Sequence, residues 1–104
     1  MGFQRVIALS ALREGELRPV AVDGIELFVV RIGERAYAYE DACPHAGVQL
    51  SEGTLRGCVL TCERHGWQFD VATGDALPPA RTALTSYAVE VRGGHVLVDV
   101  KRSR

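Results

Sequence analysis

Short stretches of β-branched, aliphatic and aromatic residues recur along this chain, separated by glycines, prolines and charged residues. Stretches of this length and composition are typical of β-strands, and turns at short intervals between them favour an all-β sandwich. The predicted strands are Phe3 to Leu9, Leu17 to Val22, Ile25 to Ile32, Ala36 to Tyr39, Thr54 to Arg56, Val59 to Thr61, Trp67 to Phe69, Tyr87 to Val91 and His95 to Val100.

Glycine and proline indicate how several of these strands are connected. Asp23-Gly24 is a two-residue hairpin signal, and Arg92-Gly93-Gly94 predicts a second hairpin near the end of the sequence. Pro19 cannot donate to a strand ladder, so the strand that contains it is predicted at a sheet edge. Ser10 to Gly15 predicts a single helical turn, with the serine as its cap and the glycine at its end.

The length and composition are those of one globular domain. With 104 residues, 47% of them hydrophobic and 24% charged, the chain is expected to form a single domain over residues 1–104. No apolar stretch is long enough to cross a bilayer or to act as a secretory signal, which favours a cytoplasmic protein that does not bind membranes. The basic run from Lys101 to Arg104 is short and terminal, which argues against a nucleic-acid partner.

Charge is distributed unevenly, although the whole chain carries only −1. The segment from Glu40 to Asp75 has a net charge of −4 and the remainder has +3. Such an acidic segment could steer a basic partner protein, while the simpler interpretation is a solvated surface.

Two short segments combine a cysteine with a histidine, as Cys43-Pro-His45 and Cys62-Glu-Arg-His65. Soft thiolate sulfur with imidazole nitrogen suits either zinc or an iron–sulfur cluster. A single tetrahedral zinc is usually held by pairs spaced two to four residues apart. Cys43 and His45 are closer than such a knuckle needs, and in an extended segment residues i and i+2 lie about 6.6 Å apart on one side. The pair would therefore span two metal ions more easily than chelate one, and a structural zinc module remains the alternative.

The two segments, Cys43-Pro-His45-Ala-Gly47 and Cys62-x-x-His65-Gly66, resemble the two binding loops of Rieske [2Fe–2S] proteins. The resemblance covers roughly Ala36 to Val100. It includes Gly74 to Pro79, which is similar to the proline loop of that family, and Leu84-x-x-Tyr87-x-Val89-x-Val91, which is similar to the strand that follows it.

The resemblance implies one [2Fe–2S] cluster with two cysteine and two histidine ligands. Cys43 and Cys62 would hold one iron, and His45 and His65 would hold the other. The family fold implies an antiparallel β-sandwich base with a small inserted cluster-binding lobe, here about 41–80. The residues expected around the cluster are Gly47, Gly66, Trp67, Phe69, Pro78 and Pro79.

High-potential members of the family place a serine and a tyrosine where this chain has Trp67 and Phe69, and those hydroxyls donate hydrogen bonds to the cluster sulfurs. Neither residue here has a hydroxyl, which disfavours reduction. We therefore expect a reduction potential at the low end of the Rieske range, on the order of −150 to 0 mV.

The remaining cysteine, Cys58, and the remaining histidine, His95, are not expected to bind the cluster. Cys58 is expected to be a small buried apolar side chain, and His95 a partly exposed strand residue. Respiratory Rieske proteins carry an extra disulfide-forming cysteine in each loop, at positions where this chain has Val48 and Glu63. The sequence thus resembles the soluble ferredoxin branch. The three tyrosines are expected to pack with their hydroxyls at the surface.

The sequence contains no nucleophile with a paired base, no phosphate-binding glycine loop and no open metal-site motif, which argues against an enzyme. The favoured function is one-electron transfer between proteins. Gln49 to Gly53, Val59 to Cys62 and Trp67 to Asp70 resemble toluene-monooxygenase ferredoxins of bacterial multicomponent oxygenases. That resemblance implies a monomer that takes electrons from an NAD(P)H-dependent flavin reductase and passes them to a terminal oxygenase of aromatic or hydrocarbon catabolism. The alternative is the small Rieske-like subunit of an assimilatory NADH nitrite reductase.

Overall fold

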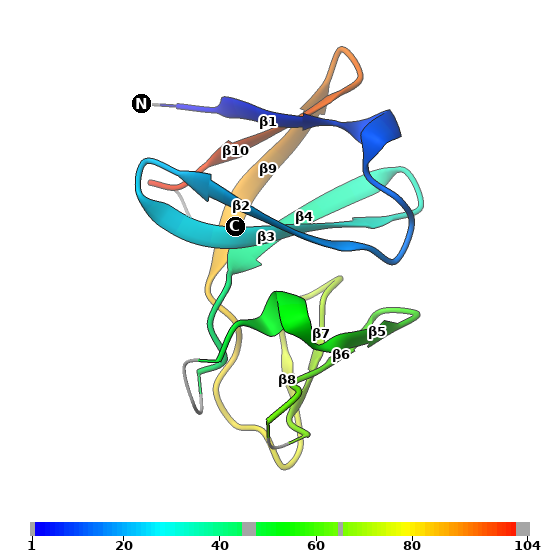
Figure 1. The fold of residues 1–104 in the computed structure, drawn as a ribbon, viewed down its shortest axis with the longest axis vertical. Coiled ribbons are helices and arrows are strands. Elements are labelled where there is room, and N and C mark those ends of the chain that lie inside the picture. Colours follow the sequence, from blue (N-terminus) through cyan, green and yellow to red (C-terminus); the bar gives the residue numbers. More distant parts are fainter. Residues whose placement is uncertain (1, 45–47, 65, 102–104) are drawn as a thin grey trace.

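In the computed structural model, which describes residues 2–44, 48–64 and 66–101, the chain forms two antiparallel β-sheets (Figure 1). The elements are β1 (Gln4–Ala8), the 3-10 turn η1 (Leu9–Ala11), β2 (Leu17–Val22), β3 (Ile25–Ile32), β4 (Arg35–Glu40), the 3-10 turn η2 (Leu50–Glu52), β5 (Thr54–Arg56), β6 (Val59–Thr61), β7 (Gln68–Asp70), β8 (Ala76–Leu77), β9 (Ser86–Arg92) and β10 (His95–Asp99). The larger sheet has the strand order β1-β10-β9-β4-β3-β2, and the smaller has the order β5-β6-β7-β8. None of the described residues forms a helix long and apolar enough to cross a membrane.

Two tight turns build the larger sheet, as the sequence predicts. Asp23 and Gly24, with φ of 53° and 80°, connect β2 to β3, and Gly93 and Gly94, with φ of 58° and 78°, connect β9 to β10. Two successive residues with positive φ give the hairpin turn whose twist matches the strands it joins. Pro19 lies in the edge strand β2, where its missing N–H is tolerated.

The larger sheet curls, so that its edge strands β1 and β2 approach each other. The Gln4 amide nitrogen donates to the Asp23 carboxylate across this approach at 2.8 Å. Side chains from β2, β3, β4 and β10 meet inside the curl, together with a leucine that follows η1. The buried members of this core are Leu12, Val22, Leu27, Val29, Ala36, Ala38, Val96 and Val98. The predicted all-β sandwich is therefore confirmed.

The smaller sheet belongs to the segment between β4 and β9 and lies at one end of the larger sheet (Figure 1). A second core joins the two sheets, because it takes side chains from β3 and β4 as well as from the small sheet. Its buried members are Phe28, Val30, Tyr39, Cys43, Leu50, Leu60, Cys62, Phe69, Val71, Ala80 and Leu84.

Three local expectations are wrong. The first helical turn is η1, whose N-cap is Ala8, two residues before the predicted cap Ser10, and which ends at Ala11 and not near Gly15; it has no side-chain cap. The Arg31 guanidinium of β3 donates to the carbonyls of Leu9 and Leu12, at 3.2 and 3.3 Å, so a distant strand holds this turn. The Tyr39 hydroxyl is buried rather than at the surface. Cys58 is only half-buried.

Candidate metal centre

The hairpin of β6 and β7 carries one of the two predicted ligand loops. The Cys62 N–H donates to the Trp67 carbonyl at 2.7 Å, which extends the strand ladder by one pair beyond β6. The Gly66 N–H donates back to the Cys62 carbonyl at 3.1 Å, and its φ of 74° is a conformation that glycine adopts without strain. The hairpin tip is thereby held in a tight turn directly after the thiol. His65, the predicted ligand in this tip, lies outside the described residues.

The other predicted loop connects β4 to η2. The Cys43 N–H donates to the Val48 carbonyl at 2.8 Å. His45 and Gly47, predicted as a ligand and as a neighbour of the cluster, lie outside the described residues.

The two loops close in the same way despite their different histidine spacing. In each, the cysteine N–H donates to the carbonyl of the fifth residue after it. A backbone bond of this kind fixes where the chain enters and leaves the loop, and so fixes where the cysteine sits relative to its strand. The two candidate thiols therefore stand at equivalent positions of two similarly closed loops.

Both thiols are buried in one apolar environment. Cys43 is 2% exposed and Cys62 is 1% exposed, and both belong to the core that contains Leu60 and Phe69. Neither forms a disulfide. Two soft sulfur donors from separate loops, both buried in one core, fit a thiophilic metal centre. Among the described residues, no three His, Cys, Asp or Glu side chains share a metal-binding arrangement, and both candidate histidines lie outside that set.

The third cysteine is separated from these two by a strand. Cys58 precedes β6, whereas Cys62 follows it, and the Cys58 carbonyl accepts a hydrogen bond from the Val71 N–H at 2.8 Å. Its side chain packs at the margin of the same core. Cys58 thus has a packing position at the opposite end of the strand from the candidate ligand.

The two aromatic residues after the second loop differ in burial. Phe69 is fully buried in β7, and Trp67 is half-buried and packs against the core that contains both thiols. Trp67 precedes β7, because the observed strand begins at Gln68, one residue later than predicted. Neither position brings a side-chain hydroxyl to the centre.

The predicted proline loop lies beside the second ligand loop. β8 pairs with β7 so that Leu77 faces Gln68, and the same register carries Pro78 toward Trp67. The Ala80 N–H donates to the Leu77 carbonyl at 2.9 Å, which closes a turn in which both prolines are exposed. This turn and the β6–β7 turn lie at the end of the small sheet farthest from the large one (Figure 1).

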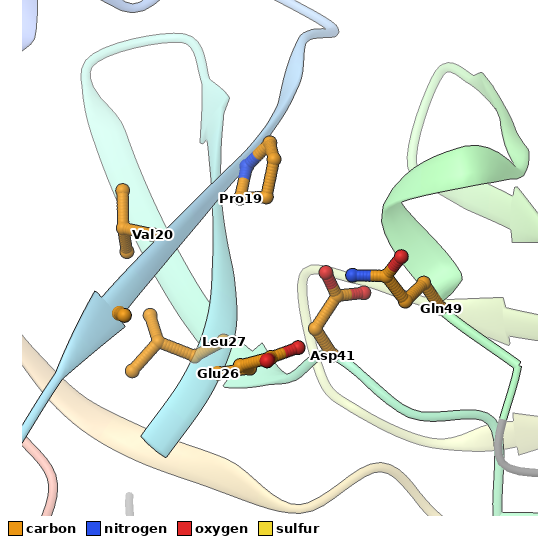
Figure 2. Close-up of a pocket in the computed structure, with 7 residues that line it drawn as sticks. Pro19, Val20, Glu26, Leu27, Asp41 and Gln49 are labelled. Atoms are coloured by element: carbon orange, nitrogen blue, oxygen red, sulfur yellow. The ribbon is translucent and has the colours of Figure 1, made fainter. Parts of the chain in front are cut away.

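A cleft of about 310 Å³ separates the β2–β3 hairpin from the segment that follows β4. Figure 2 shows its lining, with the Asp41 carboxylate pointing toward the chain that carries Gln49. Asp41 is 4% exposed, and its carboxylate accepts hydrogen bonds from the Ser51 N–H at 2.8 Å and the Ser51 hydroxyl at 2.7 Å. The residues around Asp41 do not reveal that it is buried; its place two residues before Cys43 is the only sequence feature that points to it.

One ionisable group near the start of the first loop is perturbed. Burial, and secondarily the Glu40 carboxylate, raises the pKa of Tyr87 above its usual value of 10.0. Tyr87 faces Ala38 across β4 and β9. Because its pKa is raised, the hydroxyl stays neutral at physiological pH.

His95 lies half-buried at the start of β10, with its Nδ1 3.2 Å from the Gly93 carbonyl oxygen.

Comparison with protein families and known proteins gives a consistent result. The family model described as the Rieske [2Fe–2S] domain matches residues 2–88. The ferredoxin component of the alkene monooxygenase system of Xanthobacter autotrophicus is 39% identical over 97 residues, which cover 92% of this chain and 80% of that protein. The ferredoxin CarAc of Metapseudomonas resinovorans is 43% identical over 96 residues, which cover 90% of each chain.

A solved structure described as a complex of reduced oxygenase and oxidized ferredoxin in carbazole 1,9a-dioxygenase contains a similar chain. It superposes with a TM-score of 0.89 at 38% identity, over 98% of this chain and 95% of that chain.

Proposed function

The chain belongs to the Rieske [2Fe–2S] domain family, and we propose that Cys43, His45, Cys62 and His65 bind the cluster that makes it a one-electron carrier. The relatives are ferredoxin components of alkene and aromatic oxygenase systems, and the function of this chain is electron transfer in such a system, not catalysis. We further propose that residues 1–104 form a single domain and that residues 41–80 form its cluster-binding lobe.

The observation that carries the ligand assignment is the matched pair of loops. Cys43 and Cys62 are buried in one core, and each begins a loop closed by the same backbone hydrogen bond. Each loop contains one histidine within three residues of its cysteine. In this proposal the two cysteines bind one iron, and His45 and His65 bind the other.

A bound [2Fe–2S] cluster would accept and release one electron. The ligands of this chain set how readily it does so. Two imidazoles in place of two thiolates remove two negative charges from the ligand set, so reduction is easier than in a centre with four cysteines. Trp67 and Phe69 offer no hydroxyl to the sulfurs, which works in the opposite direction. The balance favours a potential low in the Rieske range.

The partners follow from the systems in which the relatives act. One structural relative is part of a complex described as reduced oxygenase and oxidized ferredoxin. We propose that this chain, as a monomer, takes electrons from a flavin-dependent reductase and passes them to a terminal oxygenase. The exposed turns beside the second loop, including Pro78 and Pro79, lie where a partner would approach the centre. No observation favours the nitrite reductase subunit, since the relatives are oxygenase ferredoxins.

The test is chemical analysis and spectroscopy of anaerobically purified protein. Iron and acid-labile sulfide are expected in equal amounts, with a red-brown colour and, after reduction, the low average g value of a mixed cysteine and histidine cluster. A redox titration should follow a one-electron curve. A colourless protein that holds zinc, or a cluster with the g values of four-cysteine ligation, contradicts the assignment.

A further inference from the structure

The start of the first ligand loop is tied to the η2 turn by a buried carboxylate. Asp41, two residues before Cys43, accepts hydrogen bonds from both the N–H and the hydroxyl of Ser51. Its own N–H donates to the Glu26 carbonyl in β3 at 3.1 Å. Asp41 therefore joins three segments, namely the base strand β3, the entry to the first loop, and η2. Figure 2 shows its carboxylate between Glu26 and Gln49.

The end of η2 presses against the strand that leads to the second ligand loop. A Cβ atom placed on Gly53 would lie 2.3 Å from the Thr61 carbonyl oxygen, a contact that real Cβ atoms essentially never make. The φ of Gly53 is −80°, which any residue adopts, so glycine is required here by the close approach and not by backbone conformation. Thr61 directly precedes Cys62.

These two contacts form one continuous connection between the candidate ligands. It runs from Cys43 back to Asp41, across to Ser51, along η2 to Gly53, and across to Thr61 and Cys62. Leu50 is fully buried in the core that holds both thiols, and η2 also contacts β2 of the large sheet. The turn is thus hydrogen-bonded to Asp41 and packed against the core and β2.

We propose that Asp41, Ser51 and Gly53 are positioning residues that fix the separation of the two cysteine loops and thereby the geometry of the metal centre. The inference rests on the proposed ligand assignment. Groups that orient metal ligands through hydrogen bonds commonly change metal affinity about 10- to 100-fold when they are removed. The turn Leu50–Glu52 separates the two loops. The Asp41 carboxylate fixes its position relative to the first loop, and the close approach of Gly53 to the Thr61 carbonyl fixes its position relative to the second.

The sharpest test compares Asp41→Ala with Asp41→Asn. An asparagine side chain can accept from the Ser51 N–H and donate to the Ser51 hydroxyl, so it keeps the connection and removes the charge. Glu52→Gln is the matched control, because it removes an exposed carboxylate from the same turn. Ser51→Ala removes one of the two hydrogen bonds, and Gly53→Ala forces the Thr61 carbonyl away.

Three properties are measured on the cluster-loaded proteins: the g values after reduction, the rate of cluster loss to an iron chelator, and the midpoint potential. Asp41→Ala and Gly53→Ala are expected to shift the g values and to lose the cluster on the order of ten times faster than wild type. Ser51→Ala should change both properties in the same direction by less. Asp41→Asn and Glu52→Gln should keep the wild-type g values and loss rate. Loss of the buried charge should raise the potential in both Asp41 variants.

The outcomes separate this inference from the proposed function. A wild-type protein without iron and sulfide overturns both. A loaded wild type with Asp41→Ala unchanged in g values and loss rate overturns only the positioning role. Equal changes of the g values and the loss rate in Asp41→Ala and Asp41→Asn also overturn it, because the charge would then be the cause. If Gly53→Ala does not fold, the two Asp41 variants decide the result alone.

Discussion

The Tyr39 hydroxyl donates a hydrogen bond of 2.5 Å to the backbone carbonyl of Val71, which lies 32 residues later in the chain. Tyr39 is fully buried in β4 of the large sheet, and Val71 follows β7 of the small sheet. The bond therefore fastens the lobe with the candidate ligands to the base of the molecule. We expect Tyr39→Phe to leave a buried carbonyl unsatisfied and to lower the free energy of unfolding by about 1–3 kcal/mol, measured by denaturant titration.

The matched control for this substitution is Tyr87→Phe. Tyr87 is a half-buried residue of the neighbouring strand β9, and its loss of a hydroxyl should change the free energy of unfolding by less than about 0.5 kcal/mol. Equal effects from the two substitutions would show that the Tyr39–Val71 bond does not contribute to stability.

The three cysteines allow a direct test of the thiol ligands. Cys43→Ala should abolish cluster assembly, because a neutral methyl group replaces a buried sulfur donor. Cys58→Ala changes the same atoms in a half-buried residue at the other end of β6 and should leave the iron content at the wild-type level. Iron and sulfide analysis of both variants checks this. An intact cluster in Cys43→Ala, or its loss in Cys58→Ala, contradicts the assignment.

Replacing a histidine ligand should change the potential in a known direction. His65→Cys adds a negative thiolate to the centre, so reduction becomes harder and the midpoint potential should fall by roughly 100 mV or more if the cluster assembles. His95→Cys is the control, because His95 lies half-buried at the start of β10 in the base and should leave the potential unchanged. A redox titration of both variants measures the difference. An unchanged potential in a loaded His65→Cys protein would show that this residue is not a ligand.

The features that sequence predicts well are those decided by neighbouring residues. Asp23-Gly24 and Gly93-Gly94 adopt the positive φ values that a hairpin turn requires, so both hairpins are where the sequence places them. The β6–β7 hairpin around Cys62 is also predicted within one residue. In each case the turn chemistry and the flanking apolar residues are adjacent in the chain.

The missed features depend on residues far apart in the chain. η2 is fixed by the Asp41 carboxylate ten residues before Ser51, and no local signal reveals that pairing. Glycine is needed at position 53 because the Thr61 carbonyl oxygen lies too close for a Cβ atom. The φ of Gly53 is negative, so no turn with positive φ marks this position in the sequence. β8 has only two residues, too few for a periodic sequence pattern. It forms because its backbone pairs with the edge of β7.

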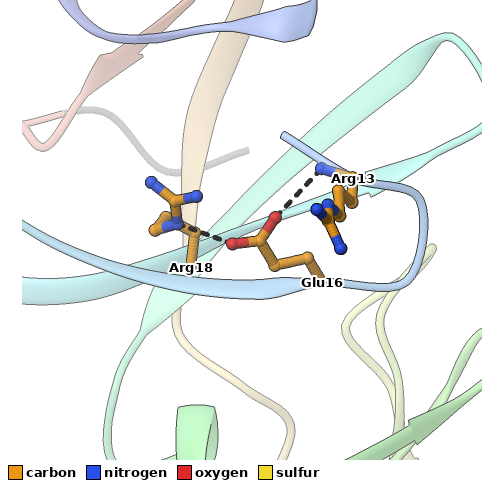
Figure 3. Close-up of polar contacts among 3 residues, drawn as sticks. All are labelled: Arg13, Glu16 and Arg18. Carbon is orange, nitrogen blue, oxygen red and sulfur yellow. Dashed lines mark hydrogen bonds and ion pairs between the residues drawn. The ribbon is translucent and has the colours of Figure 1, made fainter. Parts of the chain in front are cut away.

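An ion pair on the base offers a test of pH dependence away from the ligand loops. Glu16 accepts a hydrogen bond from the Arg13 N–H at 3.0 Å and pairs with the Arg18 guanidinium at 2.7 Å (Figure 3). The Arg13 backbone bond first, and Arg18 second, lower the pKa of Glu16 below its usual 4.5. Because the folded pKa is lowered, the carboxylate stabilises the fold above pH 4.5, and this contribution is lost as the pH falls through the folded value.

Carboxyl titration of Glu16 by NMR checks this expectation. Arg18→Gln should raise the pKa of Glu16 yet leave it below 4.5, because the backbone bond remains. Arg13→Gln keeps that backbone bond and removes only the Arg13 charge, so it should raise the pKa of Glu16 by less than Arg18→Gln does. The pair is partly exposed, so Glu16→Gln should cost less than about 1 kcal/mol at neutral pH. A Glu16 pKa at or above 4.5 in the wild type contradicts the observed geometry.

The absence of a hydroxyl at Phe69 leads to the last prediction, which concerns the potential. Phe69 is fully buried in the core that contains both candidate thiols. In Phe69→Tyr the new hydroxyl should donate to the centre, and a hydrogen bond about 1 kcal/mol stronger in the reduced state raises a one-electron potential by about 40 mV. Val89→Thr adds a hydroxyl to β9 of the base and should leave the potential unchanged. A wild-type potential well above zero, or a Phe69→Tyr potential at or below the wild-type value, would show that hydroxyl donors at this position do not set the potential.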